Sequence, residues 1–231
     1  INESFNTNML GTQTVLNEIE NNLNYLTNLK KVVFVSSDKA CSPVNVYGMC
    51  KALSEKLMIE KSKYIDKVKF LTIRYGNVLN SNGSIIPTLH KIGNDDNKKS
   101  FILTHEDMTR FVMTLEQSVD LIEYALENGE NGDIIIPKLI SCKIKDLLKI
   151  FSEKYNKPIE VIGLRPGEKL LESLINVTQS QNMEIKEDGH YILKPPYKNY
   201  YKFDNSRDYN SSINPLSKEE LKELLIKLNL L

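Results

Sequence analysis

The chain has 231 residues, of which 30 are basic, 30 are acidic and 41% are hydrophobic, an ordinary composition for one good-sized globular domain. The balanced charge argues against a nucleic-acid partner, and no apolar run approaches the length that spans a bilayer. The three cysteines make no metal-ligand spacing with the three histidines. We therefore predict reduced thiols, a cytoplasmic location, and neither a metal nor a membrane partner.

The chain begins within a predicted helix. Phe5, Met9 and Leu16 recur at helical spacing, and one long helix is expected over residues 4–28. No initiator Met, cationic region or apolar leader precedes it. We therefore expect the sequence to be a fragment of a longer protein.

Strand and helix alternate in the next segments. The β-branched run at 31–36 predicts a parallel strand buried on both faces, residues 46–63 return to helical periodicity, and 68–74 predict another strand. This alternation is typical of an α/β fold with crossover units and a parallel sheet.

Shorter elements are expected after residue 77. We predict strands at 101–103, 133–137 and 159–163 and helices at 115–126 and 145–154. A last helix should begin after Ser217, with Glu220 completing a capping box. The tail over 179–209 is expected to be irregular, apart from a strand near 191–193.

Candidate catalytic groups follow the first predicted strand, which ends in Ser36-Ser37-Asp38-Lys39. In open parallel sheets, ligands bind just past the carboxyl ends of the strands. Asp38 could instead cap the next helix, but Asn45 is the better cap and leaves Asp38 available for another role.

Tyr47 and Lys51 lie four residues apart and therefore on one face of the next helix. A nearby ammonium would lower the pKa of the tyrosine toward that of a useful general base. Alone, this spacing is a weak signal, and an exposed helical pair would be the preferred interpretation. Its position beside Asp38 and Lys39 reverses that preference.

These segments resemble the active site of the extended short-chain dehydrogenase/reductases. Residues 36–40 and 43–51 are similar above all to inverting UDP-N-acetylglucosamine 4,6-dehydratases of polysaccharide biosynthesis. Further similar blocks follow in the family's order and cover most of the chain: 8–12, 74–78, 83–87, 108–111 and 165–169. The region after about residue 178 matches least well.

The resemblance implies a lyase reaction with a role for each group. Tyr47, assisted by Lys51, would take the proton of the sugar C4 hydroxyl while hydride moves to NADP or NAD. Lys39 would then remove the C5 proton, and Asp38 would protonate the departing C6 hydroxyl. Ser37, where relatives usually carry Thr, would hydrogen-bond the C4 oxygen. Hydride return to C6 would regenerate a tightly bound cofactor.

Binding roles are implied for further residues. Tyr47, Lys51, Tyr75 and Asn77 would contact the cofactor. The UDP-sugar would contact Asn77, Pro87, Arg110, Arg165 and Glu168. Arg165 suits the diphosphate and Glu168 the ribose, although both could also be solvated charges of a surface turn. Asn8 would order the active-site helix.

The implied architecture is the C-terminal part of a doubly wound, Rossmann-like parallel sheet. Residues 1–80 would form the C-terminal half of the dinucleotide-binding domain, and 81–231 a small mixed α/β substrate-binding region interleaved with the main sheet. None of the 10 glycines forms the glycine-rich turn of a dinucleotide site after a strand. We therefore expect the fragment to be inactive alone, and the full-length protein to be a homo-oligomer.

Alternative functions remain open. A UDP-sugar 4-epimerase of the same superfamily uses Tyr and Lys but has no need of Asp38 and Lys39. A UDP-glucose 4,6-dehydratase would differ only in its substrate. Tyr47 disfavours the long membrane-anchored retaining dehydratases, which usually carry Met there. A non-catalytic nucleotide-sugar-binding module is the alternative from another class.

Overall fold

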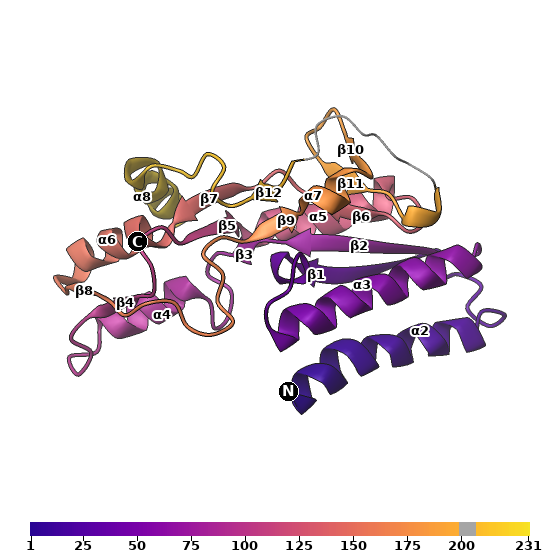
Figure 1. Ribbon diagram of the computed structural model, residues 1–231, viewed down its shortest axis with the longest axis horizontal. Coiled ribbons are helices and arrows are strands. Elements are labelled where there is room, and N and C mark those ends of the chain that lie inside the picture. The colour runs from indigo at the N-terminus through magenta and orange to yellow at the C-terminus, as the bar shows by residue number, and fades with distance from the viewer. Residues whose placement is uncertain (199–206) are drawn as a thin grey trace. The chain divides into compact units, whose positions relative to one another are not determined.

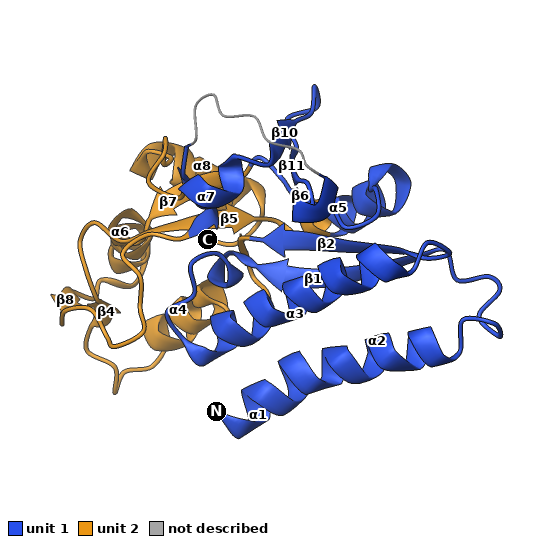
Figure 2. Ribbon diagram, turned by 45° about the vertical axis from the view of Figure 1, so that its right-hand side comes forward, with its two compact units in different colours: residues 1–75, 119–138, 173–209 blue, residues 76–118, 139–172, 210–231 orange. Residues whose placement is uncertain are grey.

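Helices and strands alternate through the first third of the chain, as the sequence predicts (Figure 1). The computed structural model describes residues 1–198 and 207–231. Two compact units are present (Figure 2): unit 1 comprises Ile1–Tyr75, Val119–Lys138 and Ser173–Tyr209, and unit 2 comprises Gly76–Ser118, Leu139–Glu172 and Asn210–Leu231. The chain first passes from unit 1 to unit 2 after Tyr75, whereas the sequence predicted a division after residue 80. The chain then returns to unit 1 twice, because later strands complete the sheet of that unit.

Unit 1 is built on a five-stranded sheet in the order β1-β2-β6-β11-β10. Its strands are β1 (Lys31–Ser37), β2 (Lys69–Tyr75), β6 (Ile134–Ile136), β11 (Tyr191–Leu193) and β10 (Met183–Ile185). The first three are parallel, and the last two add antiparallel pairs. The crossover from β1 to β2 is α3 (Val46–Tyr64).

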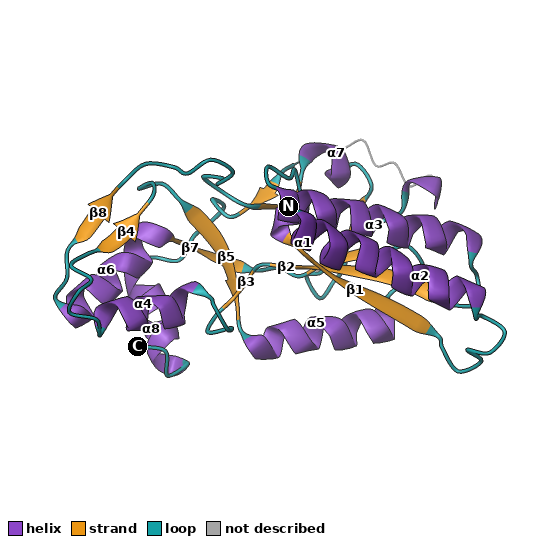
Figure 3. Ribbon diagram, turned by 90° about the horizontal axis from the view of Figure 1, so that it is seen from below, coloured by secondary structure: helices purple, strands orange, loops and turns teal. Residues whose placement is uncertain are grey.

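Helices cover both faces of this sheet (Figure 3). On one face, Leu16 of α2 and Met58 of α3 pack with Phe70 of β2. On the other, α5 (Leu115–Asn128) packs against Ile73 of β2. Successive strand residues point to opposite faces, so β2 serves both cores. The α/β, doubly wound fold predicted from the sequence is confirmed.

Two predictions for the N-terminal segments are wrong in detail. The first helix consists of α1 (Asn2–Ser4), a π-helical turn (Phe5–Leu10) and α2 (Gly11–Asn21), and it ends well before residue 28. Strand β1 is not buried on both faces, since Val35 is 38% exposed. Among the described residues β1 pairs with β2 alone, which places it at the edge of the sheet.

Unit 2 is a small mixed α/β assembly. One sheet has the order β3-β5-β7, and β4 pairs with β8 in a second. These strands are β3 (Asn77–Val78), β5 (Thr109–Met113), β7 (Ile140–Lys143), β4 (Phe101–Leu103) and β8 (Ile159–Val161). Helices α4 (Ile85–Gly93), α6 (Ile144–Tyr155) and α8 (Lys218–Lys227) enclose a core that includes Phe151 and Leu225.

Local capping signals are confirmed, whereas several short elements were not predicted. Ser217 and Glu220 form the expected capping box of α8. Helix α4 and strands β3, β5 and β7 were not predicted: the strands are too short for a clear period, whereas α4 does carry apolar residues at helical spacing, Ile85, Leu89 and Ile92. The tail contains more structure than expected, with β9 (Ser173–Ile175) before it and α7 (Val177–Ser180), β10, a 3-10 turn (Pro196–Lys198) and β12 (Tyr209–Asn210) within it. Residues 199–206 of this tail lie outside the described residues.

Three further observations concern the described part of the chain. None of its helices combines the length and the apolar character that crossing a membrane requires. It also contains no group of three or more His, Cys, Asp or Glu side chains that could hold a metal ion. Cys41, Cys50 and Cys142 are buried and form no disulfide.

Candidate active site

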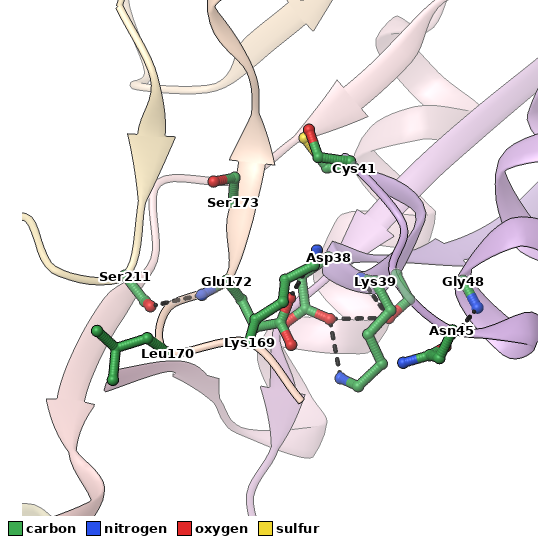
Figure 4. Close-up of polar contacts among 12 residues, drawn as sticks. Asp38, Lys39, Cys41, Asn45, Gly48, Lys169, Leu170, Glu172, Ser173 and Ser211 are labelled. Carbon is green, nitrogen blue, oxygen red and sulfur yellow. Dashed lines mark hydrogen bonds and ion pairs between the residues drawn. The ribbon is translucent and has the colours of Figure 1, made fainter. Parts of the chain in front are cut away.

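The Ser37-Asp38-Lys39 segment forms a hydrogen-bonded group at the carboxyl end of β1. A 3-10 turn begins at Asp38, and the Ser37 hydroxyl caps it by accepting from the Lys39 amide at 3.2 Å. Asp38 is fully buried. Its Oδ1 accepts from Ser37 Oγ at 2.9 Å. It also accepts from Lys39 Nζ at 3.0 Å, a contact that Figure 4 marks. The structure therefore brings together three of the predicted catalytic residues.

The second carboxyl oxygen of Asp38 differs from the first. Oδ2 is buried and has no hydrogen-bond partner among the described residues. Buried carboxyl oxygens are normally satisfied, so this atom marks a position for a proton or a ligand donor. The side chain of Lys39, by contrast, is 35% exposed. Asp38 is thus enclosed by the protein, whereas Lys39 is accessible to solvent.

Close packing holds this segment against the start of α3. Asn45 caps the helix by accepting from the Gly48 amide at 2.9 Å, as predicted, so the cap does not use Asp38. A Cβ at Gly48 would lie 2.2 Å from the carbonyl oxygen of Lys39. Only glycine permits this approach, which brings the helix bearing Tyr47 and Lys51 against the Asp38-Lys39 turn.

The electrostatic surroundings of Tyr47 differ from the expected ones. Burial raises the pKa of Tyr47 above its ordinary value, and the Asp38 carboxylate adds to the increase. The Lys39 ammonium and a hydrogen bond with Ser37 act in the lowering direction. Lys39 rather than Lys51 is therefore the cation that assists the phenolate.

Lys51 is directed to the strand. Its Nζ donates to the Val35 carbonyl at 3.0 Å and lies 6.0 Å from the centroid of the Tyr47 ring. Burial lowers the pKa of Lys51, and the Glu55 carboxylate opposes the decrease. The predicted lowering of the Tyr47 pKa by Lys51 is therefore wrong, because this ammonium interacts with the strand and with Glu55 instead.

A charged network that the sequence interpretation missed lies behind this segment. Arg74 of β2 and Glu55 of α3 form a buried ion pair, and the Ser36 hydroxyl donates to Glu55. An arginine at the end of the apolar run Phe70–Ile73, and a glutamate one helical turn after Lys51, were the available signals. Neither signal shows that Glu55 and Arg74 form a pair.

The structure places Tyr75 beside the candidate catalytic segment and describes Asn77 within unit 2. Tyr75 is the last residue of β2 and pairs in register with Ser37. Asn77 begins β3, and its Oδ1 is buried without a hydrogen-bond partner among the described residues. This amide oxygen is available to a ligand donor.

Two predicted substrate-binding residues occupy ordered positions within unit 2. Pro87 is half-buried in the first turn of α4. The Arg110 guanidinium donates to the carbonyl oxygens of Thr109 at 2.7 Å, Lys169 at 2.9 Å and Leu170 at 3.3 Å. Arg110 therefore fixes the backbone that follows the Arg165–Glu168 turn.

Arg165 and Glu168 are the ends of a tight turn. The Glu168 amide donates to the Arg165 carbonyl at 3.0 Å, and the Arg165 amide donates to Glu168 Oε2 at 3.1 Å. Pro166 and Gly167, with a φ of +80°, occupy the central positions that such a turn favours. Arg165 is exposed. A surface turn is thus present, and it leaves this arginine accessible to an anion.

Asn8 contributes to the order of α3 through its backbone. Its carbonyl, within the π-helical turn, accepts from Ser54 Oγ of α3 at 2.8 Å. The Asn8 side chain donates within its own helix, to the Ser4 carbonyl at 3.2 Å. The expected support of the active-site helix is therefore present but does not use the amide group.

Comparison with known proteins identifies related sequences over almost the whole chain. A family model described as "Polysaccharide biosynthesis protein" matches residues 1–194. A protein named as an uncharacterized membrane protein of Methanocaldococcus jannaschii is 38% identical over 99% of this chain and 70% of its own length. A protein named UDP-glucose 4-epimerase of Rickettsia bellii is 39% identical over 98% of this chain and 69% of its own length.

Solved structures show the same fold. The X-ray structure of Pen from Bacillus thuringiensis superposes with a TM-score of 0.84 at 32% identity, over 97% of this chain and 68% of that one. DesIV, a dTDP-glucose 4,6-dehydratase from Streptomyces venezuelae solved with NAD and TYD bound, superposes with a TM-score of 0.60 at 18% identity. That match covers 71% of this chain and 55% of the other, and it supports the fold alone.

Proposed function

Because the chain belongs to the polysaccharide biosynthesis protein family, within the extended short-chain dehydrogenase/reductases, we propose that it acts as a nucleotide-sugar 4,6-dehydratase. The substrate that we propose is UDP-N-acetylglucosamine, and the product a UDP-4-keto-6-deoxy sugar inverted at C5. The observation that carries the proposal is the Asp38-Lys39 pair bonded to Ser37 at the carboxyl end of β1. An epimerase changes only C4 and has no use for this additional acid–base pair.

The residues at this strand end fit the nicotinamide end of a dinucleotide. The Tyr47 phenol, on a side chain that is 40% exposed, and the Lys51 ammonium can both donate to ribose hydroxyls. Tyr75 and Asn77 are the further residues that would contact the group. When bound, NADP or NAD would supply an acceptor for the C4 hydride and a source of the hydride needed later at C6.

Tyr47 acts in this proposal as the base for the C4 hydroxyl. Burial makes its phenolate costly, so the nearby Lys39 ammonium and the Ser37 hydroxyl are needed to support it. Ser37 also offers a hydrogen bond to the C4 oxygen. Lys51 holds the helix to the Val35 carbonyl.

Lys39 and Asp38 perform the elimination. A proton moved along their 3.0 Å contact, from Nζ to Oδ1, converts both groups into their working forms at once. After C4 oxidation Tyr47 holds the C4 proton and no longer needs the Lys39 ammonium, and a site from which the substrate has displaced water then favours this neutral pair. The Lys39 amine then takes the C5 proton, which the C4 ketone has acidified, and Asp38 protonates the departing C6 hydroxyl. The C5–H and C6–O bonds break, a C5=C6 double bond forms and water leaves, so the original ion pair is restored.

Unit 2 supplies the residues that we propose for the nucleotide. The accessible Arg165 guanidinium suits the diphosphate, and the Glu168 carboxylate suits ribose hydroxyls. Arg110 contributes by fixing the backbone at Lys169 and Leu170. Pro87 and Asn77 would lie against the nucleotide.

Incubation of the protein with UDP-N-acetylglucosamine in deuterated water tests this function. The protein should be expressed with all the sequence that its gene encodes, and the products followed by NMR and mass spectrometry. We expect loss of one water and a single deuterium at C5, because the C5 enolate left when hydride returns to C6 takes a proton of solvent origin, on the face opposite Lys39 as inversion requires. A sugar that keeps its C6 hydroxyl would contradict the proposal.

A UDP-sugar 4-epimerase is the second candidate, favoured by relatives of that name at 37–40% identity in several Rickettsia species. The same experiment separates the two, since inversion at C4 without water loss or deuterium at C5 identifies an epimerase. A parallel incubation with UDP-glucose identifies the preferred sugar. Binding of either nucleotide without any change would identify a non-catalytic binding module.

A further inference from the structure

A buried ion pair stands directly behind the candidate catalytic segment. Arg74 is 0% exposed and Glu55 is 2% exposed. Arg74 Nε donates to Glu55 Oε1 at 2.9 Å, and Nη2 donates to Oε2 at 2.7 Å. This two-pronged contact permits one relative orientation of the two side chains, unlike a single hydrogen bond.

The pair joins several elements of unit 1. Ser36 pairs in register with Arg74, and its hydroxyl donates to Glu55 Oε1 at 2.6 Å. The remaining terminal nitrogen of Arg74 donates to the Leu174 carbonyl at 2.5 Å and to Gln179 Oε1 at 2.9 Å. The ends of β1 and β2, helix α3 and the β9–α7 segment are therefore joined through this one ion pair.

Stability alone does not account for this arrangement. Burying both charges carries a desolvation cost, and well-packed apolar residues of similar size often give equal or greater stability. What an apolar pair cannot supply is directional bonding to Ser36. The distinctive property of the network is thus the position that it imposes on the end of β1.

The catalytic groups lie within a few residues of this network, so the position of the end of β1 sets their position. Ser36 immediately precedes Ser37 and Asp38. Glu55 lies one turn after Lys51, whose Nζ is bonded to the Val35 carbonyl. Helix α3 is therefore bonded to β1 at two successive residues, just before the strand enters the Asp38-Lys39 turn.

We propose that Glu55 and Arg74 are positioning residues, which fix the end of β1 against α3 and so set the placement of Asp38 and Lys39 relative to Tyr47. The chemistry that they serve rests on the proposed function, whereas the positioning itself rests on the contacts within unit 1. Neither residue touches the reacting atoms in this scheme.

A double variant, Glu55→Met with Arg74→Met, removes the network without leaving a buried charge. Asp133→Met with Lys194→Met is the matched control, because that pair is also largely buried, has a 3.0 Å contact and lies in unit 1 at the amino end of β6. We expect kcat of the first variant to fall about 100-fold with KM within about 3-fold, as for a small misplacement of catalytic groups. The control should keep kcat within about 3-fold.

Ser36→Ala is the second variant, which removes only the 2.6 Å bond and is expected to fold. Its kcat should fall about 10-fold, and Ser36→Thr, which keeps the hydroxyl, should restore most of it. Unchanged kcat in Ser36→Ala, or an equal loss in the Asp133/Lys194 control, would overturn the positioning role. The kcat of Ser36→Ala therefore tests the positioning role even if the Glu55/Arg74 double variant does not fold.

A readout without turnover separates this proposal from the proposed function. Carbon-13 labelling of tyrosine reports the titration of Tyr47 by NMR, which depends on the nearby Lys39 and Ser37. We expect the titration to move to higher pH in Ser36→Ala and to stay unchanged in the control. If the wild-type protein proves to be an epimerase, this shift still tests the positioning. An unshifted titration would contradict it whatever the reaction.

Discussion

Tyr47 depends on its immediate neighbours for its charge. Burial and Asp38 raise its pKa, whereas Lys39 and Ser37 oppose the increase. A raised pKa leaves little phenolate near neutral pH, so a reaction that uses this base should accelerate as pH rises. The same residue thus links the electrostatics of the segment to the rate of C4 oxidation.

We predict that kcat/KM rises with pH between about pH 6 and 9, up to about tenfold per pH unit where the phenolate limits the rate. Tyr47→Phe should lose about 10²–10⁴-fold in rate and abolish this rise. Steady-state kinetics across this range make the test, with Tyr64→Phe as a control on the same helix. A flat profile for the wild-type protein would refute the base role.

Asp38 and Lys39 can be separated by their effects on hydrogen exchange and on water loss. Asp38→Asn keeps the shape but can neither take the Lys39 proton nor supply the acid proton, so we expect water loss to fall at least about 10²-fold and deuterium entry at C5 to fall less than water loss. Lys39→Met should lose both, because the C5 base is gone. Measurement in deuterated water by NMR distinguishes the two. Equal loss of C5 exchange in both variants would mean that the two roles are not divided in this way.

At the scale of elements, the contact between α3 and the catalytic turn depends on a missing side chain. A Cβ at Gly48 would lie 2.2 Å from the Lys39 carbonyl, a backbone atom that cannot yield without moving the turn. At Gly11 of α2, the nearest atom to an added Cβ is 3.5 Å away, which is ordinary contact. A side chain is therefore excluded at Gly48 but can be accommodated at Gly11.

Gly48→Ala should lower the free energy of unfolding by about 1–3 kcal/mol and reduce activity, because the turn must shift. Gly11→Ala should raise the free energy of unfolding by up to about 1 kcal/mol, since alanine favours the helix. Urea denaturation followed by circular dichroism measures both. A neutral Gly48→Ala variant with full activity would show that the close approach is not needed.

At the scale of the whole molecule, each unit has its own hydrophobic core. In unit 2, Phe151 and Cys142 belong to one cluster, and burial raises the pKa of Cys142 to about 12. Its thiol is therefore protected from alkylation at pH 8 while unit 2 is folded. Cys50 is buried in unit 1 and serves as an internal reference.

Phe151→Ala should cost about 3–5 kcal/mol and accelerate alkylation of Cys142 by iodoacetamide, because the core of unit 2 opens more often. Mass spectrometry resolves the labelled peptides. Cys50 should be labelled at an unchanged rate if opening is confined to unit 2. Equal acceleration at both cysteines would show that the chain opens as one cooperative body.

Local sequence determined much of the element pattern and the content of the candidate site. Alternating apolar periods predicted the α/β fold, and short-range signals placed the caps at Asn45 and Ser217. Ser37, Asp38 and Lys39 are adjacent in the chain, so their clustering required no knowledge of distant contacts. These features depend on neighbours within a few residues, which a sequence shows directly.

Tertiary structure decided what depends on residues far apart in the chain. The pairing of Glu55 with Arg74, the exposure of Val35 at the sheet edge and the assembly of unit 1 from separate stretches all arise from strand order and packing. The same holds for Tyr47, whose supporting cation is Lys39 because Lys51 bonds the strand. Which charges come close in a folded core is set by long-range geometry, and periodicity along the chain does not encode it.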